Sequence, residues 1–71
     1  MQISAKLLES DKKTEINWYE VTIDGHVSVY GYAYNTNQLL DDDGYPYDTK
    51  SYIDDAVQYT IEQQIGGNNE R

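Results

Sequence analysis

The residues of this 71-residue chain that could do chemistry are almost all carboxylates and tyrosines. The chain has 13 Asp and Glu residues, eight tyrosines, one histidine and no cysteine. A carboxylate works as a general acid or base only where a water-excluded cleft shifts its pKa, and a lone histidine without a partner nucleophile provides no covalent catalysis. We therefore expect a protein that is not an enzyme. His26 is expected to be an exposed strand residue, and the alternative is a switch that titrates near neutral pH.

The acidic run 41–44, Asp-Asp-Asp-Gly, suggests calcium binding. In an EF-hand loop the glycine occupies position 6, which would place Leu39 at position 1 and Lys50 at position 12, where the loop requires acidic ligands. Both end positions fail, so the sequence predicts no metal site and no cofactor. Asp41, Asp42 and Asp43 are expected to form an acidic turn in contact with solvent.

The charge is large and unevenly distributed. The formal net charge is -8, and between Thr14 and Glu70 the chain holds eleven acids against one base, Lys50. Such a chain repels nucleic acid, whose binding depends on Lys and Arg, and it repels anionic membrane surfaces. No apolar run approaches the roughly 20 residues of a membrane span, and the N-terminus does not resemble a signal peptide. We expect a soluble, cytoplasmic protein that binds neither membrane nor nucleic acid directly.

Three strands are predicted in the first half of the chain. Residues 2–8 alternate apolar and polar side chains, and residues 15–23 and 26–34 are rich in β-branched and aromatic residues. The Asp24-Gly25 pair is a typical two-residue hairpin turn, which places Trp18 opposite Gly31 with its ring over the glycine. The polar run 9–14 is predicted to be a loop, and Leu39-Leu40 is expected to anchor the following segment to the core.

The second half of the chain contains a predicted helix. Ile53, Val57, Ile61 and Ile65 recur every four residues, which is typical of an amphipathic helix of about four turns. Asp48, Thr49 or Ser51 can cap it, and with Ser51 as the cap Asp54 completes a box-like arrangement. Gly66-Gly67 is expected to end the helix. The fold class is therefore α+β: a three-stranded antiparallel β-meander followed by one C-terminal amphipathic α-helix packed on one sheet face. Residues 1–67 form a single domain, and residues 68–71 form a flexible tail.

Both faces of the predicted sheet are partly apolar, but one helix covers only one face. The Trp18 face carries Ile16, Trp18, Val27, Val29 and Ala33, and the tyrosine face carries Tyr19, Val21, Ile23, Tyr30, Tyr32 and Tyr34. We expect the Trp18 face to be the core, because its side chains have no hydroxyl groups to satisfy, and we expect Ile3, Ala5 and Leu7 to extend it. The tyrosine face would then be a binding surface or the interface of a homodimer. The alternative is that the helix covers the tyrosine face instead.

Function is predicted from the carboxylates. Acidic side chains on a small rigid frame can imitate nucleic-acid phosphates and attract a basic nucleic-acid-binding protein. We expect Asp54, Asp55 and Glu62 on the outward side of the helix, with Asp41, Asp42, Asp43 and Asp48 extending the row. Tyr19, Tyr30, Tyr32 and Tyr34 would supply contact area.

In its size, charge, lack of cysteine, hairpin YEVTIDGHVSVY and acidic segment LLDDDGYPYD, the chain resembles the small acidic DNA-mimic proteins of phages and mobile elements. That group includes anti-restriction proteins, anti-CRISPR proteins and inhibitors of nucleoid proteins or uracil-DNA glycosylase. The resemblance is one of kind and implies inhibition of a host factor or defence system by occlusion. The alternative function is a protein-interaction or assembly module that uses the tyrosine face, with acidity serving only solubility.

Overall fold

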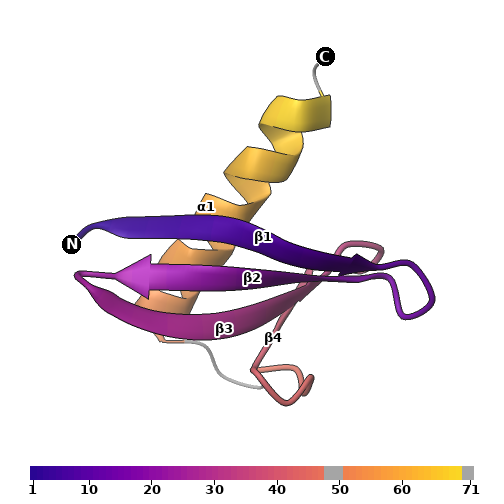
Figure 1. Cartoon of the computed structure of the whole chain (residues 1–71), viewed down its shortest axis with the longest axis horizontal. Helices are drawn as coiled ribbons and strands as arrows, with labels where there is room; N and C mark the ends of the chain where they lie inside the picture. The colour runs from indigo at the N-terminus through magenta and orange to yellow at the C-terminus, as the bar shows by residue number, and fades with distance from the viewer. Residues whose placement is uncertain (48–50, 70–71) are drawn as a thin grey trace.

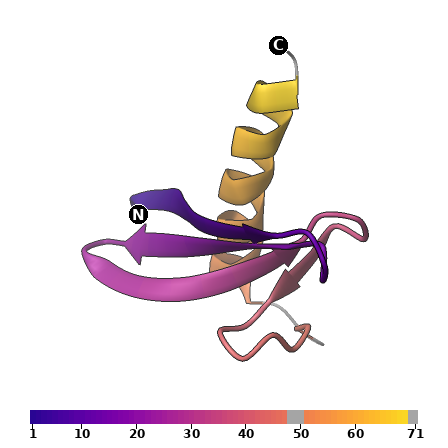
Figure 2. The same ribbon diagram turned by 45° about the vertical axis from the view of Figure 1, so that its right-hand side comes forward.

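The protein is a four-stranded antiparallel sheet with one helix across it. The computed structural model describes residues 1–47 and 51–69. The elements are β1 (Ile3–Asp11), β2 (Ile16–Ile23), β3 (His26–Ala33), β4 (Gln38–Leu40) and α1 (Tyr52–Asn69), and the strands lie in the order β1-β2-β3-β4. Figures 1 and 2 show α1 on a single side of the sheet, crossing the strands at a steep angle. The predicted α+β class and three-stranded meander are confirmed, and β4 is an additional short strand.

The β2–β3 hairpin has the predicted register. Ile23 pairs with His26, Tyr19 with Tyr30 and Trp18 with Gly31. The turn residues Asp24 and Gly25 have φ angles of 48° and 88°. Positive φ at both central residues is the property of the type I′ turn, whose twist matches that of the strands it joins. The local turn chemistry therefore fixes which side chains share a face.

Strand β1 is longer than predicted. It continues through Glu9, Ser10 and Asp11, which were predicted to lie in a loop. The register with β2 shifts between Leu7 and Glu9, as in a β-bulge. A bulge inserts an extra residue into one strand and so changes which side chains face which side. The last part of β1 was not predicted because the alternation of apolar and polar side chains breaks at the bulge.

The helix covers the tyrosine face. Tyr19, Val21, Tyr30 and Tyr32 are buried together with Leu39, Val57 and Ile61 in one core cluster. The prediction that the Trp18 face is the core is therefore wrong, and the alternative is correct. Ile3 and Ala5 pair with Ile23 and Val21, so they also pack against the tyrosine core instead of extending the Trp18 face. Leu7 pairs with Tyr19 but is exposed.

The tyrosine hydroxyl groups are satisfied at the margin of the core. The Tyr32 hydroxyl oxygen lies 2.8 Å from Asn37 Oδ1 and 3.1 Å from Glu62 Oε2, so its single proton has two acceptors within reach, and Tyr30 has a longer contact of 3.4 Å with Asp54 Oδ1. The expectation that hydroxyls disfavour burial fails because each ring can be buried while its oxygen reaches a polar partner at the edge of the helix. Burial of these rings then contributes stability as any large apolar surface does.

Helix α1 begins with the predicted capping box. The Ser51 backbone N–H donates to Asp54 Oδ2 at 3.1 Å, and the Asp54 N–H donates to Ser51 Oγ at 3.2 Å. The helix continues through Gly66 and Gly67 to Asn69, so the prediction that these glycines end it is wrong. A glycine commonly ends a helix by adopting the left-handed conformation, but the helical backbone here continues past both glycines.

Within the described residues, no helix combines the length and apolarity that crossing a membrane requires.

Candidate binding surface

The face of the sheet opposite the helix remains open, and we call it the open face. It carries Val27 and Val29, whose side chains are 62% and 40% exposed, and Leu8 at the β1 bulge is 51% exposed. Trp18 and Ile16 lie half-buried beside them. An apolar patch of this kind on a small domain is typical of an interaction surface. Ile16, Trp18, Val27 and Val29 were predicted to belong to the core, and Leu8 was given no role.

Trp18 is the centre of the open face. Its ring covers Gly31, where an added Cβ would lie 2.9 Å from Trp18 Cζ3, and a Cβ at Gly44 would lie 3.9 Å from Trp18 Cη2. Leu40 pairs with Gly31 and is 5% exposed. The indole of β2 thus packs on β3 at Gly31, and the turn after β4 lies near its far edge. The predicted position of this ring over Gly31 is confirmed.

Carboxylates border the apolar part of the open face. Glu9 pairs with Trp18 and Asp11 with Ile16, and paired residues of adjacent strands share a face. Glu20 pairs with Val29 on one side and with Lys6 on the other. Asp42 lies beside Val27 and Val29 in the groove described below. Lys6 is therefore the one base that these strand pairings bring onto the open face among the described residues.

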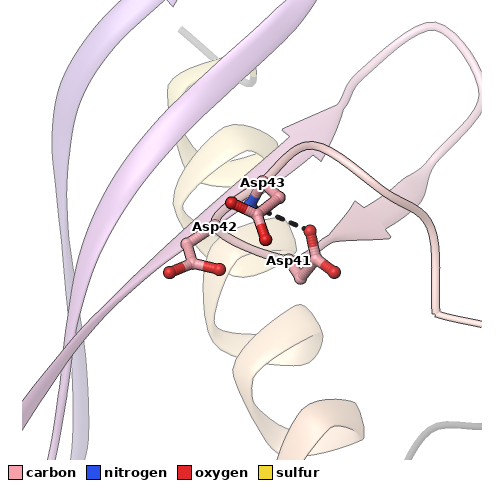
Figure 3. Close-up of side chains that lie close together, drawn as sticks. All are labelled: Asp41, Asp42 and Asp43. Atoms are coloured by element: carbon pink, nitrogen blue, oxygen red, sulfur yellow. Dashed lines mark hydrogen bonds between the residues drawn. The ribbon is translucent and has the colours of Figure 1, made fainter.

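The acidic turn after β4 is built around the Asp41 carboxylate, which accepts a backbone N–H bond of 2.9 Å from Asp43 (Figure 3). It accepts a second backbone N–H bond of 2.9 Å from Tyr45. The Asp41 N–H donates to the Tyr45 carbonyl at 2.9 Å, and Gly44 has a φ of 91°. A side chain that bonds the backbone two residues onward is an Asx turn, which holds the loop in one conformation. Asp42 and Asp43 remain exposed.

Asp41, Asp42 and Asp43 form a cluster of three carboxylates, in which an oxygen atom of each lies within 4.8 Å of the others. Within the described residues, this is the one cluster of three or more such side chains that is close enough to share an ion. The close-up shows the three side chains gathered at the turn (Figure 3). Position 1 of the EF-hand pattern falls on Leu39, which is fully buried. The prediction of an acidic turn in contact with solvent is confirmed for Asp42 and Asp43, whereas Asp41 is half-buried.

The helix acids do not form the predicted outward row. Asp54 is half-buried, and its carboxylate accepts from the Ser51 N–H in the capping box. Glu62 is half-buried and accepts hydrogen bonds from Tyr32 and from Gln58, the latter at 3.0 Å. Of the three helix carboxylates, Asp55 is the exposed one. Residues four and eight positions apart share a helix face, so Asp54, Gln58 and Glu62 lie together along the margin of the sheet. Asp48 lies outside the described residues.

The four tyrosines predicted to contact a partner are not exposed together. Tyr19, Tyr30 and Tyr32 are buried, and Tyr34 is exposed beside Glu62 in a groove of about 380 Å³. Burial raises the pKa of Tyr32 to about 12, with Glu62 adding to the effect. Burial likewise raises the pKa of Tyr30, which stacks on Tyr47 with ring centroids 6.2 Å apart. These rings are structural, and Trp18, Val27 and Val29 replace them as the aromatic and apolar surface open to a partner.

A groove of about 480 Å³ lies along the first half of β3. It is lined by Val27, Ser28, Val29, Tyr30, Asp42 and Tyr47. His26, at the start of β3, is exposed as predicted. This groove was not predicted from the sequence, because it depends on where the three-residue strand β4 stops pairing with β3. The homodimer remains a prediction, and the open face replaces the tyrosine face as its expected interface.

The comparisons with known proteins give no relatives: no family model, no curated protein and no solved structure matches the chain.

Proposed function

We propose that the chain is a non-enzymatic binding protein that occludes the basic, nucleic-acid-binding surface of a partner protein, as a DNA mimic does. The observation that carries this proposal is the open face, where Trp18, Val27 and Val29 are bordered by Glu9, Glu20 and Asp42. The helix covers the opposite face, so these side chains have no layer of this chain above them within the described residues. A surface with apolar contacts inside an acidic border suits a basic protein.

Two physical effects would produce binding. The net charge of -8 attracts a basic protein over distances of about a Debye length, which accelerates encounter. The exposed apolar side chains then lose water against the partner, and their burial contributes affinity without any chemistry. A partner whose Lys and Arg residues contact these carboxylates cannot use the same residues on DNA or RNA phosphates. Inhibition therefore follows from occupancy alone.

The buried tyrosines alter how this function would work. Tyr19, Tyr30 and Tyr32 are part of the core, so they supply little contact area beyond the margin of Tyr30 that lines the groove. The exposed carboxylates Asp42 and Asp43 lie on a turn held by Asp41, and a rigid turn loses little conformational entropy on binding. We therefore assign electrostatic recognition first to this turn and to the border of the open face, and second to Asp55 on the helix.

The alternative, an interaction or assembly module in which acidity serves only solubility, is favoured by the exposure of Val27, Val29 and Leu8. The two functions differ in their response to salt. Binding through carboxylates weakens steeply with ionic strength, whereas binding through an apolar sheet face does not.

The test uses two variants with the same change in net charge. Asp42→Asn with Asp43→Asn removes two charges from the acidic turn, and Asp55→Lys changes the charge by two units on the helix. Immobilised wild type is expected to capture basic nucleic-acid-binding proteins from a bacterial lysate treated with nuclease. Added duplex DNA or raised salt should release them.

The turn variant should lose this capture, and the helix variant should retain most of it. Circular dichroism of both variants provides the folding control. If both variants capture as wild type does, and salt has no effect, electrostatic mimicry is wrong and the assembly module is supported. If Asp55→Lys alone abolishes capture, the helix is the recognition surface.

A further inference from the structure

The first half of β3 is a strand edge without a neighbour. Strand β4 pairs with β3 only from Gly31 to Ala33, after which the chain turns away at Asp41. Within the described ranges 1–47 and 51–69, no residue continues this pairing beside His26–Tyr30. The groove of about 480 Å³ lies at this place. It is the continuation, along β3, of the position that β4 occupies.

The register determines which backbone groups point into the groove. A two-residue hairpin closes with a hydrogen-bonded pair, here Ile23 with His26, and hydrogen-bonded pairs alternate along antiparallel strands. The N–H and C=O groups of Val27 and Val29 therefore point away from β2. Gly31 and Ala33 belong to the same row, and they are the residues that β4 pairs with through Leu40 and Gln38. The free row of β3 thus continues a row that already binds a strand.

The opposite edge of the sheet, strand β1, is partly satisfied by the helix. In β1 the corresponding outward carbonyl of Ala5 accepts a hydrogen bond of 2.6 Å from Gln64 Nε2 of the helix. Side chains that cover or satisfy an edge prevent it from pairing with other chains. The register shift near Leu7 further disrupts that edge. The β3 edge has no such protection from the described residues, and its side chains Val27 and Val29 are exposed.

The charges around the groove select its occupant. Asp42 lines the groove, Asp43 is exposed in the same turn, and Asp24 is exposed at the hairpin beyond the other end of the edge. Tyr47 and Tyr30 form its aromatic wall. A second copy of this chain would bring its own net charge of -8 and a second Asp42 to the same place, which disfavours self-pairing. A basic segment brings the complementary charge.

We propose that the groove beside Val27–Val29 binds an extended, basic segment of a partner protein as an additional strand on β3. This site rests on the proposed function and specifies how the basic partner is held. The backbone of the segment pairs with Val27 and Val29, its Lys or Arg side chains meet Asp42, and its apolar side chains lie along the valines. Strand addition of this kind takes affinity from main-chain hydrogen bonds and specificity from alternate side chains. About five residues suffice to span His26–Tyr30 at 3.3 Å per residue.

The experiment uses defined peptides and the complete protein. The probe is a fluorescent eight-residue peptide of alternating Lys and Val, compared with one of alternating Glu and Val. Two further versions of the basic peptide carry N-methyl groups on alternate residues, one in each of the two possible rows. Only one row of amides can face β3, so only one of these matched versions should lose binding. The acidic peptide should not bind.

Amide hydrogen exchange of the protein identifies the edge. The Val27 and Val29 amides should exchange at least about tenfold more slowly with the basic peptide, as hydrogen-bonded amides do. The Asp42→Asn variant should weaken the peptide about two- to fivefold, the effect of one exposed charge pair. Asp55→Lys has the larger change in net charge and should weaken it less.

Three outcomes overturn the inference. Equal binding of both N-methylated peptides shows that binding does not use main-chain pairing. Peptide binding that perturbs Trp18 and Glu9 without protecting Val27 and Val29 places the basic segment on the open face instead. Protection of the two valine amides in concentrated protein without peptide shows that a second copy occupies the edge. In the first two cases, lysate capture that still depends on Asp42 and Asp43 leaves the proposed function intact, so the two failures are distinguishable.

Discussion

The Trp18 indole lies against the backbone of Gly31, its partner on the neighbouring strand, so closely that a Cβ at Gly31 would be 2.9 Å from Trp18 Cζ3. A contact below 3.0 Å requires one of the two groups to move. Trp18 is half-buried, so its ring has little room to move away from Gly31. An added methyl group at Gly31 would therefore strain the packing between β2 and β3.

Gly31→Ala is expected to destabilise the fold by about 1–3 kcal/mol, the usual cost of overpacking. Urea unfolding followed by circular dichroism measures the change. The matched background is Trp18→Leu, in which the ring is absent and the added methyl group has room. There the same substitution should cost less than about 0.5 kcal/mol, since alanine suits a strand at least as well as glycine does. Equal costs in the two backgrounds would contradict the proposed contact.

The identity of the core face is tested by two valines on adjacent strands. Val21 is fully buried under the helix, and Val27 is 62% exposed on the open face. Val21→Thr places a hydroxyl in the core and should cost about 1–3 kcal/mol. Val27→Thr should change the free energy of unfolding by no more than about 0.5 kcal/mol, as surface substitutions do. A larger cost at Val27 would mean that the Trp18 face is covered in solution, as the predicted homodimer requires.

The sequence contains enough information for the hairpin and the helix but not for their relative placement. Asp24-Gly25 determines the β2–β3 register because a two-residue turn leaves one pairing, and Ser51 with Asp54 marks the first turn of α1. Strand alternation separates the two faces without stating which one the helix covers. That choice depends on partners distant in sequence, such as Glu62 for the Tyr32 hydroxyl, 30 positions away.

The same limit applies to the candidate site. The acidic turn was recognisable from composition, and its exposure at Asp42 and Asp43 follows from polarity. The groove beside Val27 and Val29 was not recognisable, because it exists only where β4 stops pairing with β3 after Leu40. A strand of three residues carries too little periodicity to be detected, although the burial of Leu39 and Leu40 was correctly expected.

The helix cap provides a local stability test. Ser51→Ala removes the Oγ that accepts from the Asp54 N–H at 3.2 Å and donates to Asp54 Oδ2 at 3.1 Å. Loss of an N-cap typically costs about 0.5–2 kcal/mol. Thermal and urea unfolding measure this cost, and Ser4→Ala on the exposed side of β1 serves as the control with less than about 0.5 kcal/mol. Ser51→Thr should retain most of the stability because its hydroxyl can still accept from the Asp54 N–H and donate to the Asp54 carboxylate; if it loses as much as alanine, the cap is not the cause.

Buried tyrosines predict a loss of stability at alkaline pH. Burial, reinforced by Glu62, raises the pKa of Tyr32 to about 12, and burial with Tyr30 and the nearby Asp54 and Asp41 raises the pKa of Tyr47 to about 12, against 10.0 for an ordinary tyrosine. Between about pH 10 and 12 the unfolded chain has lost these protons while the folded chain keeps them. The unfolded state then binds fewer protons, so the free energy of unfolding must fall as pH rises through this window.

Unfolding in urea, followed by Trp18 fluorescence at pH 8, 10 and 11, measures this decline. The contribution of these two tyrosines to the free energy of unfolding should be nearly constant from pH 8 to just below pH 10. It should then decrease as the pH rises further. Tyr32→Phe loses the hydroxyl bonds to Asn37 and Glu62, so it should be less stable at pH 8, but it should also lose less on going to pH 11 because one titrating group is gone. Parallel pH curves for wild type and Tyr32→Phe would show that the Tyr32 pKa is not raised by its place in the core.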